Sequence, residues 1–99
     1  MQFTSWNHDG YEPSEQDREL IIEKISKLER FDARLADEST TVHVEIVRGK
    51  KHASPNFGLR VQITIPGGAL RAEASGKTVA EATDEVERKL RAQVEKMKD

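Results

Sequence analysis

The segment Phe57–Ile65 reads FGLRVQITI, and it decides the fold class of this 99-residue chain. Its large apolar side chains occupy every second position, with polar residues or glycine between them. A period of two residues is typical of a strand with one buried and one solvated face. A Pro-Gly-Gly turn follows at residues 66–68, and residues 70–75 alternate in the same way. The stretch from 57 to 75 therefore predicts a β-hairpin.

Two segments that precede the hairpin are also predicted to be strands. In Thr41–Arg48 the side chains of Val42, Val44 and Ile46 point to one side, which indicates a half-buried strand. Residues 2–6 are expected to form a short strand, which would lie at an edge if it joins the sheet. Turn-forming residues follow it up to residue 13, and they predict a loop.

Two amphipathic helices complete the pattern. The first is predicted to begin near Ser14, whose side chain can cap it, and to end between Phe31 and Leu35. The second follows residues 76–78, where Thr78 and Glu81 have the spacing of a capping box. The apolar stripe of the first helix is Leu20, Ile21, Ile25, Leu28 and Phe31. The stripe of the second helix is Val79, Ala82, Val86, Leu90, Val94 and Met97.

The order of these elements predicts the architecture. One strand, one helix, three strands and a second helix are typical of a two-layer α+β domain. We expect a four-stranded, mostly antiparallel sheet with both helices packed on one face. A chain of 11.2 kDa has room for one such core, so residues 1–99 are predicted to form a single domain.

Composition excludes several classes of protein. The sequence contains no cysteine, which removes disulfide scaffolds, thiol catalysis and cysteine metal sites. It contains no apolar run near the roughly 20 residues that a membrane span needs, and residues 1–10 do not have the pattern of a secretory signal. We therefore expect a cytoplasmic protein with no membrane partner.

The net charge of −2 conceals an asymmetry between the two halves of the chain. Residues 1–47 carry five basic and eleven acidic side chains, a net charge of −6. Residues 48–99 carry eleven basic and seven acidic side chains, a net charge of +4. Such an asymmetry favours, weakly, a nucleic-acid partner for the basic half.

Few residues point to catalysis. His43 and Glu45 alternate onto one strand face, and with His52 they could bind zinc, but no ligand spacing typical of a zinc enzyme is present. Exposed strand residues are the simpler interpretation. Gly67 and Gly68 belong to a turn rather than to a phosphate-binding loop. The sequence therefore predicts no enzyme, no cofactor, no metal and no small-molecule substrate.

Four stretches, in order and at matching spacing, resemble one known family. They are KISKLERF at 24–31, FGLRVQITIPGGAL at 57–70, ASGK at 74–77, and the helix at 79–98. The chain is similar to the ribosome hibernation promoting factors, also called ribosome-associated inhibitors or sigma-54 modulation proteins. The likeness covers nearly the whole chain. The chain looks like a short member of the family, or like the N-terminal domain of a long one.

The resemblance implies a function without chemistry. Members of this family have a β-α-β-β-β-α fold and bind the small ribosomal subunit between its head and its body. They cover the sites of messenger RNA and of A- and P-site transfer RNA, and so silence translation in stress or stationary phase. The partners implied are ribosomal RNA and ribosomal proteins, and we expect a monomer off the ribosome.

Basic side chains that flank the apolar stripes, or lie on the 49–56 loop, are the candidate RNA contacts, because lysine and arginine displace counterions from phosphates. Taken singly, each has a simpler interpretation as part of a solvated face. The resemblance favours phosphate contacts above all for Lys24, Lys27, Lys89 and Lys96. The full candidate set is Lys24, Lys27, Arg30, Lys50, Lys51, Lys77, Arg88, Lys89, Arg91, Lys96 and Lys98.

Other binding surfaces and functions remain open from the sequence. Trp6, Tyr11 and Phe57 could stack on bases, although packing is the simpler role for Phe57. The residues expected on the wet face of the sheet could bind a partner, and they are Arg60, Gln62, Thr64, Arg71 and Glu73. The alternative functions are a generic double-stranded RNA-binding module and a protein-interaction modulator that acts on a sigma factor.

Overall fold

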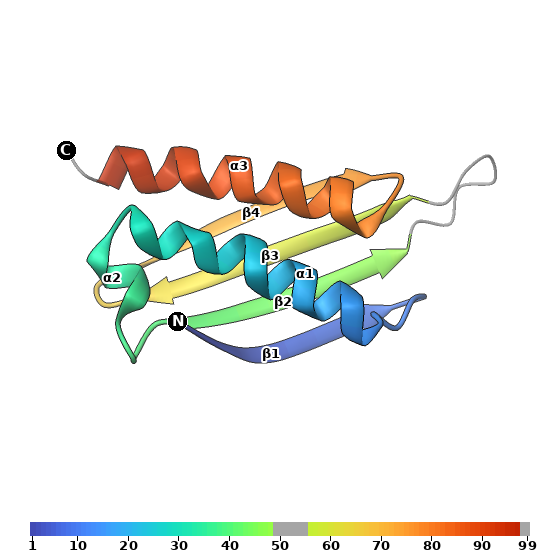
Figure 1. The fold of residues 1–99 in the computed structure, drawn as a ribbon, viewed down its shortest axis with the longest axis horizontal. Coiled ribbons are helices and arrows are strands. Elements are labelled where there is room, and N and C mark those ends of the chain that lie inside the picture. The colour runs from blue at the N-terminus through green and yellow to red at the C-terminus, as the bar shows by residue number, and fades with distance from the viewer. Residues whose placement is uncertain (49–55, 98–99) are drawn as a thin grey trace.

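The computed structural model describes residues 1–48 and 56–97, and it confirms the predicted two-layer α+β class (Figure 1). Helices α1 and α3 lie side by side over one face of a four-stranded sheet. Along the chain the elements are β1 (Gln2–Asp9), α1 (Glu15–Ser26), the 3-10 helix η1 (Lys27–Arg30), α2 (Ala33–Ala36), β2 (Thr41–Arg48), β3 (Phe57–Ile65), β4 (Gly68–Gly76) and α3 (Val79–Met97).

The strands lie in the sheet in the same order as in the sequence, β1-β2-β3-β4. Strands β2, β3 and β4 are antiparallel, and Val61 of β3 lies opposite Val44 on one side and Ala72 on the other. Strand β1 runs parallel to β2, because the helical segment between them returns the chain to the end of the sheet from which β1 began. Strands β1 and β4 are therefore the two edges.

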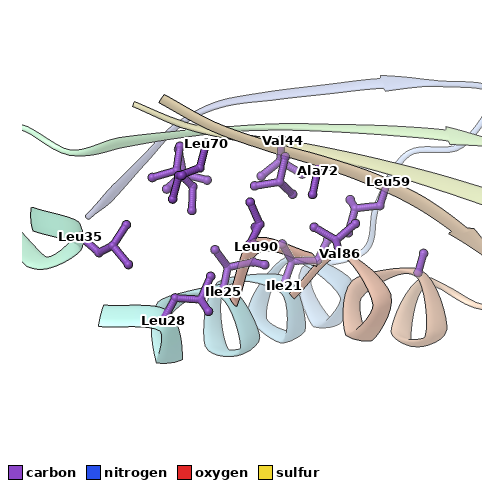
Figure 2. Packing of buried hydrophobic residues seen from close by; sticks show 14 of the residues in the cluster. Ile21, Ile25, Leu28, Leu35, Val44, Leu59, Leu70, Ala72, Val86 and Leu90 are labelled. Carbon is purple, nitrogen blue, oxygen red and sulfur yellow. The ribbon is translucent and has the colours of Figure 1, made fainter. Parts of the chain in front are cut away.

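One core lies between the helices and the sheet, as Figure 2 shows. Most apolar strand residues that were predicted to point inward are buried there, and Val44, Val61 and Ile63 are fully inaccessible. Phe57 and Ala74, at the ends of their strands, are only half-buried against this core. The stripes of both helices meet them, with Ile21, Ile25 and Leu90 also fully buried. Leu20 of the predicted first stripe is an exception, since it is only half-buried. Because the sheet has only one covered face, this layer holds nearly all the apolar surface removed from water.

The first helix is shorter than predicted. We expected it to end between Phe31 and Leu35, but α1 ends at Ser26. The chain tightens into η1 and then restarts as α2, because the side chain of Asp32 caps α2 by accepting a hydrogen bond from the backbone N–H of Arg34 at 2.9 Å. Leu28 and Leu35 are both fully buried across this break, so the apolar pattern continues while the backbone does not.

Two strands are longer than predicted. The strand expected at residues 2–6 extends to Asp9, and the strand expected at 70–75 spans Gly68–Gly76. Glycines within or beside a strand pattern obscure its ends, although the backbone pairing continues through them as far as Ile65 opposite Gly68. The hairpin turn consists of Pro66 and Gly67, and Gly67 has a φ of +86° that favours glycine.

The junction between β4 and α3 is tightly packed. A side-chain carbon on Gly76 would lie 2.7 Å from the Cβ of Glu81 and 2.8 Å from the backbone nitrogen of Ala82. The hydroxyl of Thr78 accepts a hydrogen bond from the N–H of Glu81 at 3.1 Å, as the predicted capping box requires. In a standard capping box the Glu81 carboxylate would accept a hydrogen bond from the backbone N–H of Thr78, but here it accepts from the N–H of Lys77, one residue earlier, at 2.8 Å. Within residues 1–48 and 56–97, no helix has the length and apolarity to cross a bilayer.

Candidate nucleic-acid interface

The predicted lysines of the first helical segment lie beside carboxylates. The Lys24 ammonium is 3.1 Å from a carboxylate oxygen of Asp84 on α3, which ties α1 to α3. The Lys27 ammonium is 3.9 Å from Glu23, one turn earlier. Both lysines keep a substantial exposed fraction, 36% and 47% of the side chain. They can reach a phosphate, but only in competition with these carboxylates.

The predicted lysines of α3 lie on the other flank of that helix. The Lys89 ammonium donates a hydrogen bond of 2.8 Å to the backbone carbonyl of Glu73 on β4. Asp84, which faces α1, and Lys89 are five residues apart and so point about 140° apart around the helix. Lys96 follows Lys89 by seven residues and shares its flank. The structure therefore places Lys24 on one flank of α3 and Lys89 with Lys96 on the other.

Gln93 lies on the same flank of α3 as Lys89 and also binds the backbone of β4. The side-chain amide of Gln93 donates to the carbonyl of Arg71 and its oxygen accepts from the Arg71 N–H at 3.3 Å. One side chain thus satisfies both backbone groups of an edge residue, as a neighbouring strand would. This contact holds α3 against β4 and fixes the position of the lysines beside it.

The predicted arginines of α3 are paired with acids of the same helix. The Arg88 guanidinium lies 3.3 Å from Glu85, and the Arg91 guanidinium lies 2.8 Å from Glu87. The Glu87 side chain is only 16% exposed, so its charge and that of Arg91 largely compensate each other. These two arginines contribute less free positive charge than the sequence suggested.

Four exposed cations on the α3–β4 side form no ion pair with any residue in the described part of the chain. We call them the basic edge, and they are Arg71, Lys77, Lys89 and Lys96. Three of them belong to the predicted set, whereas Arg71 was expected only on the wet face of the sheet. The structure keeps Arg71 on that face, opposite Gln62 of β3, at the edge where Gln93 of α3 binds its backbone.

The remaining predicted cations fall elsewhere. Arg30 is exposed at the end of η1 and has no acidic partner within residues 1–48 and 56–97. Lys50, Lys51 and Lys98 lie outside the described residues.

The open face of the sheet is polar and internally balanced. Arg60 lies at its centre, with its guanidinium 3.0 Å from Glu45 of β2 and 2.9 Å from Glu73 of β4. The hydrogen bond to Glu73 raises the pKa of Arg60 above its ordinary value. Gln62 and Thr64 point to the same face and are at least partly exposed, as predicted. This face offers shape and hydrogen bonds but little net charge.

The rings of the three candidate stacking residues already contact other side chains of the domain. Trp6 stacks on Phe3 with ring centroids 5.8 Å apart, and the Arg18 guanidinium lies over its ring. Tyr11 meets Phe57 edge to face at 4.9 Å. The hydroxyl of Tyr11 donates to Asp17, which raises the pKa of the tyrosine. All three rings are half-buried against the core.

Within the described residues, no three potential metal ligands gather. The ring nitrogen Nε2 of His43 lies 3.4 Å from the side-chain amide of Asn7, and Glu45 pairs with Arg60. His52, the third residue of the zinc interpretation, lies outside the described residues.

Fold and site together define the class of this protein as a small two-layer α+β domain with exposed cations at and beside the β4 edge. The family model described as "Sigma 54 modulation protein / S30EA ribosomal protein" matches residues 6–99. The chain belongs to this family, which confirms the resemblance found in the sequence.

Individual relatives agree. The chain is 31% identical over 98 residues to a protein of Deinococcus radiodurans named ribosome hibernation promotion factor. The match covers 99% of the chain but 50% of that relative, so the chain spans about half the length of the curated relative it matches.

Two solved structures share the fold. The N-terminal domain of Protein Y from Thermus thermophilus superposes with a TM-score of 0.81 at 21% identity, over 98% of this chain and 99% of that one. A ribosomal subunit interface protein from Coxiella burnetii gives a TM-score of 0.78 at 22% identity, over 99% and 98%. At this identity the likeness concerns the fold.

Proposed function

We propose that this chain silences translation by occupying the channel between the head and the body of the small ribosomal subunit. There it would cover the sites of messenger RNA and of A- and P-site transfer RNA, in the cytoplasm and under stress or in stationary phase. The observation that carries the proposal is the family match over residues 6–99, together with a relative named for ribosome hibernation. The action is occupancy, with no chemical step and no cofactor.

The shape of the domain suits this role. Its extents are 43 × 23 × 19 Å, and a continuous buried core joins the sheet to both long helices. Close-packed interiors of this kind resist deformation, so the domain acts as a rigid obstacle. A rigid obstacle excludes RNA strands by volume, without reading their sequence.

The basic edge supplies the attraction in this proposal. Lysine and arginine gain affinity for RNA by releasing counterions from phosphates, and each contact contributes about −0.7 to −0.9 to the slope of log affinity against log salt. Four contacts, one from each residue of the basic edge, imply a loss of roughly 50- to 150-fold between 50 and 200 mM salt. Lys24 and Lys27 can add contacts if phosphates replace their carboxylate partners.

The test is co-sedimentation of the purified chain with ribosomes and with isolated small subunits at two salt concentrations. Arg71→Ala, Lys77→Ala and Lys96→Ala are combined in one variant, because these side chains form no ion pair within the described residues. A Lys24→Ala and Lys27→Ala variant is the comparison, because both lysines have acidic neighbours. The first variant is expected to bind more weakly and to reduce the salt slope by about 2 to 3.

The same experiment separates the proposal from its alternatives. Affinity that does not change with salt would contradict the electrostatic model. A chain that binds plain RNA duplex as tightly as small subunits would be a general duplex binder. A chain that stays in the supernatant at low salt would instead favour the sigma-factor role that appears in the family description.

A further inference from the structure

The two edge strands of the sheet differ in whether side chains bind their outward backbone groups. At β4 the side chains of Gln93 and Lys89 bind the outward backbone groups of Arg71 and Glu73. At β1 no hydrogen bond from another element in the described part of the chain reaches the outward backbone groups of the strand. An uncovered edge strand is a template for one more strand, and proteins usually block such an edge or use it.

The usable part of this edge is short and regular. The pairing of β1 with β2 is interrupted between Phe3 and Ser5 and then runs without a break over residues 5–9. Such an interruption discourages pairing near the start of the strand. Five regular residues remain, enough for an extended segment of about 17 Å.

An apolar surface lies directly beside this edge. The half-buried ring of Trp6 stacks on Phe3 and is covered from α1 by Arg18. Ile22, one turn after Arg18, is 38% exposed, which is unusual for a large apolar side chain in this structure. A strand added next to β1 would place every second side chain beside Trp6, on the side of the flank of α1 that carries Ile22, so burial would add to the backbone hydrogen bonds.

The charge around the edge is negative. Four exposed carboxylates lie at the end of β1, in the following loop and along α1, and none of them forms an ion pair within residues 1–48 and 56–97. Two arginines are nearby: the Arg18 guanidinium lies over Trp6, and the backbone and Cβ of Arg48 lie beside Gly10. We call the carboxylates the acidic group, and they are Asp9, Glu12, Glu15 and Glu19.

We propose that the outer edge of β1 accepts an extended protein segment of alternating apolar and basic residues as a fifth strand. The charge selects this occupant. RNA phosphates would be repelled by the acidic group, and two copies of the chain paired through β1 would bring two acidic groups together. The proposal goes beyond the proposed function, because it concerns a protein partner on the edge opposite the basic one.

The test is a titration of the isotope-labelled chain with a capped synthetic heptapeptide of alternating valine and lysine. Amide resonances are followed by NMR, and the fluorescence of Trp6, the one tryptophan in the sequence, is followed in parallel. We expect saturable shifts at residues 5–9 and a change in Trp6 emission. Absence of these shifts, or shifts on α3 instead, would overturn the proposal.

Control ligands isolate the two parts of the recognition. The same peptide with methylated backbone nitrogens on the residues that face β1 is expected to lose binding, as is a peptide with glutamate in place of lysine. If the methylated peptide binds as well as the parent, no strand is added. Equal shifts at residues 5–9 with a single-stranded RNA, or with the chain alone at rising concentration, would assign the edge to RNA or to a second copy and overturn the proposal.

Two matched variants test the charge argument without disturbing the fold. Asp9→Asn combined with Glu19→Gln removes two members of the acidic group. Glu38→Gln combined with Glu95→Gln removes two exposed carboxylates elsewhere. We expect the first variant to bind the lysine peptide roughly 3- to 30-fold more weakly and the second to bind like the parent. Equal affinity of the two variants would contradict charge selection. Neither result depends on ribosome binding, so this proposal and the proposed function can fail separately.

Discussion

Gly76 shows at the scale of one residue how closely β4 and α3 are packed. The backbone of β4 passes so close to the start of α3 that any side chain would meet Glu81 and Ala82 at less than 3 Å. Its φ is not positive, so the requirement is space rather than backbone conformation. The first turn of α3, which positions Lys77, depends on this contact.

Gly76→Ala is therefore expected to destabilise the domain by about 1–3 kcal/mol, the usual cost of forcing extra atoms into a packed site. Gly68→Ala is the matched control, because a side-chain carbon at Gly68 would meet no atom within 4 Å. Urea unfolding of both variants measures the difference. Equal urea midpoints for the two variants would contradict the prediction, because they would show that the β4–α3 junction accommodates a side chain at Gly76 without loss of stability.

Individual lysines also show the limit of the sequence at this scale. Helical spacing correctly predicted that Lys24 and Lys89 flank apolar stripes. It did not predict that Lys24 meets Asp84 or that Lys89 meets a backbone carbonyl of β4, because both contacts depend on how α3 is seated between α1 and the sheet. The charge available to a partner is therefore a property of packing.

At the scale of elements, α3 both covers the core and closes an edge of the sheet. Its apolar stripe packs on the covered face of the sheet, while the side chains of Gln93 and Lys89 bind the backbone of the edge strand β4. A helix that completes an edge strand in this way blocks edge-to-edge association and fixes its own position.

Gln93→Met keeps the size of the side chain but removes both hydrogen bonds to Arg71. We expect a loss of about 1 kcal/mol in the free energy of unfolding, and faster hydrogen exchange at the Arg71 amide, because that backbone group becomes open to water. Glu95→Gln, an exposed change on the same helix, should alter neither. Unchanged exchange at Arg71 in the Gln93 variant would contradict the capping role.

The sequence predicted the elements with strict periods better than the others. Strands β2 and β3 match their predicted bounds, because alternation in a half-buried strand is unambiguous. The break between α1 and α2 was missed, since Leu28 and Leu35 keep the apolar stripe continuous and the cap of Asp32 is a local competitor to it. The length of β1 was also missed, because an irregular edge strand with polar residues lacks a clear alternation.

At the scale of the molecule, the strand order converts a charge asymmetry along the chain into one across the sheet. Because the strands lie in sequence order, the acidic first half of the chain contributes β1 with α1, and the basic second half contributes β4 with α3. The acidic group and the basic edge therefore lie at opposite edges. If the proposed function holds, this arrangement would orient the domain in the field of a ribosome, with the basic edge toward RNA.

The most direct measurement of the central claim is competition for purified small subunits between the chain and labelled P-site transfer RNA with its messenger. If the domain occupies the channel, the parent chain will release the transfer RNA at saturation. The Arg71→Ala, Lys77→Ala and Lys96→Ala variant will do so only at higher concentration. Simultaneous binding of the chain and the transfer RNA to the same small subunits would contradict the account.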